Sequence, residues 1–132
     1  MREAVEGRRE KLGARHEDTL KSVNNLAVVL NAQGKLEEAE LLMREALEGR
    51  REALGPRHPD TLMTLNNLAH TLFAQGSLVE AESLYRETVK GKREAFGPRH
   101  PDTLHTSYSL ATVLTRMGRV EESIALLSLI HI

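Results

Sequence analysis

The sequence contains no cysteine, which excludes disulfide frameworks, cysteine-based zinc sites and thiol nucleophiles. It has no excess of basic charge either, because 18 Lys and Arg residues stand against 19 Asp and Glu residues. A nucleic acid or an anionic membrane would therefore meet no net basic field. No apolar run approaches the roughly 20 residues that cross a bilayer, and the first six residues lack the apolar segment of a signal peptide. These absences predict a soluble cytoplasmic protein without a nucleic-acid or membrane partner.

The chain consists of one long sequence unit that is repeated several times. Gly13, Gly55 and Gly97 lie at intervals of 42 residues, as do three histidines and three Asp-Thr-Leu triplets. The tetrapeptide Asn-Asn-Leu-Ala occurs at 24–27 and again at 66–69. A period between about 20 and 50 residues is typical of solenoids and related repeat arrays. With 40% hydrophobic residues, the 132-residue chain has enough apolar content to build a core.

Hydrophobic spacing divides each unit into two helices, called helix A and helix B below. In the unit at 13–54, apolar residues recur every three or four positions from Leu20 to Leu30 and again from Leu36 to Leu47, with Gly34 between the two series. The unit at 55–96 repeats this pattern, and the unit at 97–132 ends in a divergent, increasingly apolar helix B. Residues 1–12 match 43–54 almost letter for letter, so we interpret them as the second half of a helix B from a preceding repeat. Either the chain is a fragment of a longer array, or it starts with an uncapped helix.

These motifs resemble the long-period tetratricopeptide repeats of kinesin light chains. The resemblance depends on Asn-Asn-Leu-Ala, on a glycine seven residues beyond its alanine, and on the His-Pro-Asp-Thr-Leu run that opens the later units. It implies an all-α, right-handed superhelical solenoid of about three antiparallel helix pairs. It also implies that helix A lines a concave groove in which an extended peptide or a partner helix binds, without catalysis and without a cofactor.

A rotation of about 100° per residue places Lys21, Asn24, Asn25 and Val28 on a face of helix A beside its buried face. An asparagine side chain carries both a donor and an acceptor and can pair with the backbone of an extended peptide. Aromatic and histidine side chains at equivalent positions would add selectivity by packing against a ligand. The predicted peptide-binding residues are Lys21, Asn24, Asn66, His70, Phe73, Tyr108, Thr112 and Arg116.

An asparagine on a repeat helix can instead bond the neighbouring helix. We expect this structural role for Asn25 and Asn67, and for Asn24 and Asn66 both roles stay open. Some members of the resembled family hold a terminal carboxylate with a Lys and Asn clamp, but Val28 stands where such a clamp needs an amide. The clamp is therefore not carried over to this chain.

The recurring His16, His58 and His100 do not predict a metal site. They occupy equivalent points of successive units, which are separated by roughly 10 Å or more, whereas zinc needs its nitrogen ligands within about 2.1 Å of one centre. We interpret them as turn residues. No carboxylate lies in an apolar stretch that would shift its pKa, so the sequence predicts no catalytic residue, metal or cofactor.

Two further features leave alternatives open. Gly7, Gly49 and Gly91 recur inside helix B, where each costs about 1 kcal/mol relative to alanine, and they mark either a close approach of helices or a local bend. The apolar run from Leu126 to Ile132 would favour association with another chain. The main prediction is a scaffold that binds a protein or peptide partner. The alternative is a structural module that forms a homo-oligomer or a domain-swapped dimer through its terminal helices.

Overall fold

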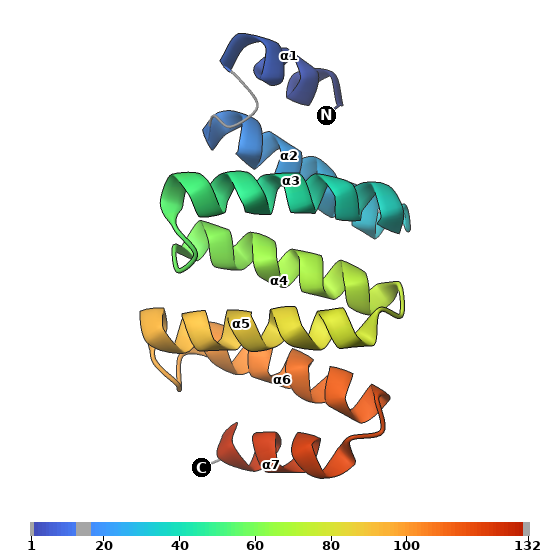
Figure 1. The fold of residues 1–132 in the computed structure, drawn as a ribbon, viewed down its shortest axis with the longest axis vertical. Helices are drawn as coiled ribbons and strands as arrows, with labels where there is room; N and C mark the ends of the chain where they lie inside the picture. The colour runs from blue at the N-terminus through green and yellow to red at the C-terminus, as the bar shows by residue number, and fades with distance from the viewer. Residues whose placement is uncertain (1, 13–16, 131–132) are drawn as a thin grey trace.

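The structure, a computed structural model, describes residues 2–12 and 17–130, without the side chains of residues 8–12. The described residues form seven helices and no strand. Their bounds are α1 (Arg2–Leu12), α2 (Glu17–Ala32), α3 (Leu36–Leu54), α4 (Pro59–Ala74), α5 (Leu78–Phe96), α6 (Pro101–Arg116) and α7 (Val120–Ile130). The helices are stacked one after another along the long axis of the molecule (Figure 1), and each packs against the next. The predicted all-α solenoid of helix pairs is confirmed, with α2, α4 and α6 as helices A and α3, α5 and α7 as helices B.

A histidine caps each helix A that follows a Pro-containing linker. The Nδ1 atom of His58 accepts a hydrogen bond from the backbone N–H of Asp60 at 3.1 Å, and His100 accepts one from Asp102 at the same distance. A proline follows each histidine as the first helical residue, where its fixed φ suits the helix and its missing N–H is not needed. His58 and His100 therefore lie at the turn, as predicted, and His16 falls outside the described residues.

The short turn from helix A to helix B depends on a glycine with positive φ. Gly34 has φ 81°, a left-handed conformation that a residue with a Cβ rarely adopts. The turn lets the N–H of Lys35 reach back to the carbonyl of Leu30 at 2.9 Å, which satisfies a carbonyl at the end of α2. Gly76 and Gly118 repeat this conformation.

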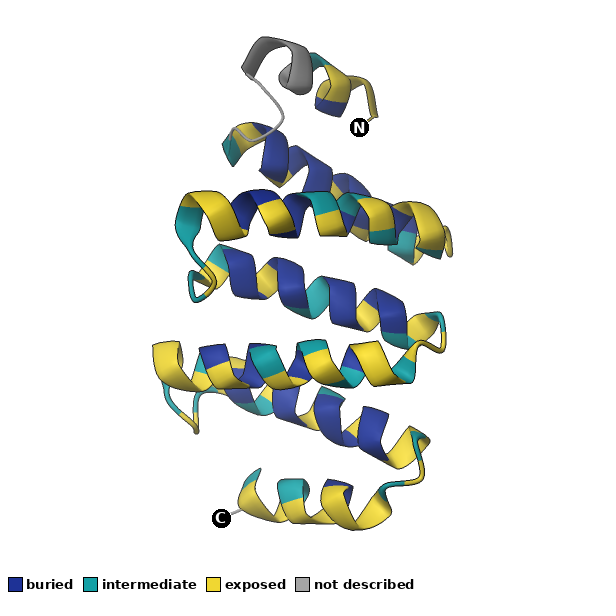
Figure 2. Cartoon of the chain, viewed as in Figure 1, coloured by how far each residue is buried: buried dark blue, intermediate teal, exposed yellow. Residues whose placement is uncertain are grey.

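The hydrophobic core runs along the stack instead of forming one core per repeat. One cluster of buried side chains extends from Ala27 of α2 to Leu114 of α6. Buried stripes consequently alternate with exposed stripes on the middle helices (Figure 2). Each helix pair buries surface against both of its neighbours, which is how repeats too small to fold alone stabilise one another.

Within a repeat, helix B approaches helix A through a glycine. A Cβ at Gly49 would lie 2.6 Å from Cδ2 of Leu20, and a Cβ at Gly91 would lie 2.5 Å from Cδ2 of Leu62. Both leucines are completely or almost completely buried, so their methyl groups have little room to move. These two glycines therefore serve a close approach and not a bend. Gly7 differs, because a Cβ there would meet no described atom within 4 Å.

Equivalent helices of successive repeats are linked differently on the two sides of the stack. Between helices A the paired side chains are small and uncharged: the hydroxyl of Thr71 donates to Oδ1 of Asn31 at 3.0 Å. Between the helices B α3 and α5 the paired side chains are long and charged, with ion pairs between Arg44 and Glu80 at 2.8 Å and between Arg51 and Glu87 at 2.7 Å.

The last helix pair is less complete than the earlier ones. α7 ends at Ile130, which is equivalent to Thr88, whereas α5 continues beyond Thr88 to Phe96. Leu104, the equivalent of Leu62, is therefore only half-buried. The predicted apolar character of α7 is visible at Leu129, which is 65% exposed; His131 and Ile132 lie outside the described residues.

Candidate functional site

The helices A carry an exposed stripe beside their buried faces. Lys21, Met63 and His105 occupy equivalent positions on α2, α4 and α6, and all three side chains are exposed. Two further sets of equivalent positions continue the stripe one and two turns along each helix, and Phe73, Tyr108 and Arg116 lie beside them. We call this stripe the helix A face; Asn67, Phe73 and Ser109 are its half-buried members, and its exposed members are Lys21, Asn25, Val28, Met63, His70, His105, Tyr108, Thr112 and Arg116.

Most of the predicted binding residues lie on this face. Lys21, His70 and Thr112 are exposed, and Tyr108 is 41% exposed. The guanidinium of Arg116 on α6 lies 4.9 Å from the ring centroid of the half-buried Phe73 on α4. This cation–π contact joins two neighbouring helices A across the face.

Asn24 and Asn66, which were predicted to line the groove, do not lie on the helix A face. Asn24 is only 3% exposed, and its Oδ1 accepts a hydrogen bond from the hydroxyl of Thr64 at 3.4 Å. Asn66 is half-buried and accepts from Thr106 at 3.5 Å. The physical reason is that the helix A of the following repeat packs against this position and covers it. In the pair Asn24 and Asn25, the exposed member is Asn25, for which we expected the structural role.

These asparagine contacts belong to a polar network that reaches helix B. Nη1 of Arg50 donates to the hydroxyl of Thr64 at 2.8 Å and to the carbonyl of Asp60 at 3.2 Å. The Arg50 side chain is 2% exposed, so the network holds a buried cation between helices of two repeats. Lys92 of α5 is equivalent to Arg50, and its ammonium donates to the hydroxyl of Thr106 at 2.9 Å. Burial lowers the pKa of the Lys92 ammonium, and the negative charge of Asp102 opposes part of that shift.

We expect Asn24→Ala to lower the free energy of unfolding by about 1–3 kcal/mol, the cost of removing one partner of a buried hydrogen bond. The neighbouring Asn25→Ala is a matched control, because Asn25 is exposed, and it should change that free energy by less than about 0.5 kcal/mol. Urea denaturation followed by circular dichroism measures both values. Equal losses in the two variants would contradict the structural role assigned to Asn24.

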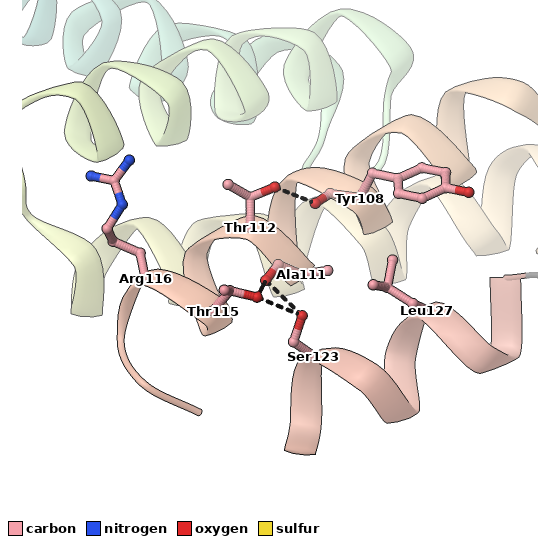
Figure 3. A pocket seen from close by; sticks show the side chains of 7 residues that line it. All are labelled: Tyr108, Ala111, Thr112, Thr115, Arg116, Ser123 and Leu127. Atoms are coloured by element: carbon pink, nitrogen blue, oxygen red, sulfur yellow. Dashed lines mark hydrogen bonds between the residues drawn. The ribbon is translucent and has the colours of Figure 1, made fainter. Parts of the chain in front are cut away.

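A hollow of about 580 Å³ opens between α6 and α7 at one end of the helix A face. Figure 3 shows Tyr108 and Leu127 on facing helices, with Arg116 near the far end of α6. Hydrogen bonds connect α6 and α7 at the bottom of the hollow: the hydroxyl of Thr115 donates to Ser123 at 2.8 Å, and the hydroxyl of Ser123 donates to the carbonyl of Ala111 at 3.0 Å. The predicted Tyr108, Thr112 and Arg116 thus come together here.

Sequence reasoning missed the contribution of α7 to this hollow. Leu127 is equivalent to Tyr85 and Met43, and both of those side chains are almost completely buried, whereas Leu127 is half-buried. The positional match was available from the repeat. Its different exposure was not, because it depends on which helices cover the site.

The charges on the helix A face have one sign. None of its members is Asp or Glu, and neither Lys21 nor Arg116 forms an ion pair with a described residue. On the helices B, by contrast, Arg44 and Arg51 are both paired with glutamates. The helix A face therefore offers positive charge to a partner although the chain as a whole has a net charge of −1.

Comparison with known families agrees with this architecture. The model of the family described as tetratricopeptide repeat matches residues 1–52, 18–94 and 60–128, which together span nearly the whole chain. The chain belongs to the tetratricopeptide repeat family. Tetratricopeptide repeats generally mediate protein–protein interactions, and the family is typically non-catalytic.

Solved structures with similar repeats include two of a putative kinesin light chain from Podosopora anserina with nearly identical repeats. One of them has a TM-score of 0.82 at 26% identity and covers 96% of this chain and 60% of that chain; a variant of the same protein has a TM-score of 0.83. BtubC (BKLC) from P. vanneervenii has a TM-score of 0.85 at 20% identity, over 92% of this chain and 48% of that one. No curated protein matches the chain. The tetratricopeptide repeats described here thus span less than two thirds of each of these structures.

Two searches of the described residues found nothing. Within residues 2–12 and 17–130, no group of three or more His, Asp or Glu side chains is placed to hold a metal ion. None of the helices in the described part of the chain is both long and apolar enough to cross a membrane.

Proposed function

We propose that the chain binds a protein segment along the helix A face, and that the bound segment carries acidic side chains or a terminal carboxylate. The observation that carries this proposal is the charge of the face: most of its residues are exposed, none of them is a carboxylate, and its two permanent cations, Lys21 and Arg116, have no ion pair with a described residue. Charge complementarity of this kind steers association and selects partners. That tetratricopeptide repeats generally mediate protein interactions supports a protein partner.

The face combines the three kinds of contact that a peptide needs. Lys21 and Arg116 lie on α2 and α6 and would attract acidic groups at two separated points. Val28 and Met63 are both more than 40% exposed, and they would contact apolar side chains of the bound segment between the two charged points. The amide of the exposed Asn25 can both donate to and accept from a peptide backbone, a role that Asn24 cannot take while it is buried under α4.

Charge reversal tests this proposal. The double variant Lys21→Glu with Arg116→Glu should bind short acidic peptides at least about tenfold more weakly than the unchanged chain, since each lost charge contact contributes on the order of 1 kcal/mol. The measurement is fluorescence anisotropy of labelled peptides, each prepared in one version with Asp and Glu and another with Asn and Gln. Binding of the acidic version should also weaken as salt is added.

The control for this experiment is a double variant with the same change in net charge away from the helix A face. Lys35 and Lys90 are exposed and lie at the start of α3 and on α5, so Lys35→Glu with Lys90→Glu should leave peptide affinity unchanged. Circular dichroism should show equal helical content in all three proteins. Equal weakening in both double variants, or equal binding of acidic and amide peptides, would contradict the proposal.

Non-catalytic action and a cytoplasmic location, both expected from the sequence, remain parts of this proposal. The family is typically non-catalytic, and the polar network around Arg50 and Thr64 has a structural explanation that requires no chemistry. The alternative predicted from the sequence, a structural module whose copies associate with one another through their terminal helices, stays a prediction.

A further inference from the structure

The two cations of the helix A face lie far apart, and their separation limits which segments fit. Building on the binding function proposed above, we propose that the bound segment is an extended chain with two acidic side chains four or six residues apart. One of them pairs with Lys21 and the other with Arg116. Phe73 sets this spacing because it holds the guanidinium of Arg116 in place, and it is therefore a positioning residue for specificity.

The ring of Phe73 gives the Arg116 side chain a defined position above α4. Phe73 is half-buried and packs against the hydrophobic core cluster that runs along the stack, so its ring is anchored. The guanidinium of Arg116 lies 4.9 Å from the centroid of this ring. In Figure 3 the guanidinium points away from Ser123 and Leu127 of α7. The cation is thus held on the helix A face.

The contact with the ring leaves Arg116 able to bind a carboxylate. A ring face attracts the cation as a whole through its π electrons, whereas the N–H donors of a guanidinium lie in its plane and point outward from its edge. Arginine presents five such donors in a fork that matches the two oxygens of a carboxylate. Arg116 has no ion pair with a described residue, so this fork is available to a partner.

The register of the helices A gives the distance between the two cations. α2, α4 and α6 point in the same direction (Figure 1). Phe73 is equivalent to Asn31, which lies ten residues after Lys21, a rise of about 15 Å. α2 and α4 pack together, since Thr71 donates to Asn31 at 3.0 Å, and the axes of packed helices are about 8–10 Å apart. The two offsets together separate Lys21 from the Phe73 ring by about 17 Å.

An extended chain covers this distance in about five residues, at roughly 3.3 Å per residue. Its side chains alternate between two sides, so two side chains that face the same helices are separated by an even number of residues. Spacings of four and six both fit, because the flexible stem of Lys21 lets its ammonium move by several ångströms. Spacings of two and ten, about 7 and 33 Å, do not fit.

The exposed amide of Asn25 favours an extended chain over a helical partner. Asn25 lies one turn beyond Lys21, between the two charged points. Its amide can pair with the free N–H and C=O groups of an extended backbone, whereas a helix uses those groups internally. A helix would span the same distance with acidic side chains about eleven residues apart, so a helix-forming peptide with that spacing represents the alternative.

A set of peptides of equal length and composition tests the spacing. Each carries two Asp residues in a Ser and Thr background, separated by two, four, six or ten positions, so that only the span between the acids changes. We expect the tightest binding at a spacing of four or six, about fivefold tighter than at two and ten, since only there do both acids reach a cation. Fluorescence anisotropy measures the affinities. Arg116→Gln should make all four equal.

Two variants of Phe73 test its positioning role. Phe73→Leu keeps an apolar side chain against the core but removes the ring face, so Arg116 is no longer held and the fivefold preference should fall to about twofold or less. Phe73→Tyr keeps the ring and should keep the preference. A purely structural role would weaken all peptides equally and leave the spacing profile unchanged. A fivefold preference that survives in Phe73→Leu would overturn the positioning role.

The same titrations separate the spacing requirement from the function on which it rests. If acidic peptides bind more tightly than their amide versions but equally at every spacing, the spacing requirement is overturned and the proposed function stands. If acidic and amide peptides bind equally, the proposed function fails and the spacing requirement fails with it. Tightest binding by the helix-forming peptide would overturn the extended conformation of the bound segment.

Discussion

Replacing Leu62 with alanine is expected to lower the free energy of unfolding by about 2–5 kcal/mol, the range for a fully buried leucine. The same substitution at Leu104, the equivalent residue of the next repeat, should lower it by roughly half as much or less. The chemistry is identical and only the surroundings differ: Leu62 is 1% exposed beneath Gly91 of α5, whereas Leu104 is half-buried because α7 ends before the corresponding position.

Urea denaturation, followed by circular dichroism, gives both values if the transitions have similar slopes. A change of slope in one variant would indicate that the repeats no longer unfold together, since neighbouring repeats share their stability. The measurement belongs at a concentration low enough to keep the chain monomeric. Equal losses at the two positions would show that Leu104 is covered as completely as Leu62, which would contradict the incomplete last pair.

The helices and their order could be predicted from the sequence because the signals that define them are local. A period of 42 residues identifies the repeat, and apolar residues every three or four positions identify two helices in it. A glycine after each helix A and a proline at the start of the next then place the turns. Each signal involves residues within a few turns of one another, so none depends on how the helices are arranged.

The roles of Asn24 and Asn25 could not be predicted in this way. The two residues differ by about 100° around the helix, and either direction borders the buried face. Which of them is covered depends on a helix A that begins about forty residues later and contributes Thr64. The sequence of α2 holds no information about the direction from which that helix approaches. Any groove assignment based on rotation alone therefore carries an ambiguity of one residue.

The three helix B glycines show a second limit of repeat-based reasoning. Gly7, Gly49 and Gly91 are equivalent in sequence, yet two of them lie against a leucine and one faces open space among the described residues. Duplication of the repeat explains why the glycine recurs, whereas the packing of helix A against helix B determines at which positions a glycine is needed. The same distinction applies to Leu127, whose equivalents Tyr85 and Met43 are buried by a following repeat.

This distinction leads to the second large expected effect. Gly91→Leu should destabilise the fold by about 3 kcal/mol, at the upper end of the usual cost of overpacking, because its Cβ alone would lie 2.5 Å from a methyl group of Leu62. The leucine is almost completely buried and cannot move aside without displacing its own neighbours. The gain in helix propensity from removing a glycine, about 1 kcal/mol at most, offsets only part of this cost.

Gly7→Leu is the natural control, since the same substitution at the equivalent position meets no described atom; it should leave the stability of the monomer unchanged or slightly higher. A second variant identifies the cause of the loss at Gly91. If the clash with Leu62 is responsible, adding Leu62→Ala to Gly91→Leu should make the double variant more stable than the sum of the two separate losses predicts. The expected coupling is about 1–3 kcal/mol. Simple additivity would mean that Gly91 is needed for another reason, such as the guanidinium of Arg57, whose Nη1 atom would lie 3.2 Å from a Cβ at this position.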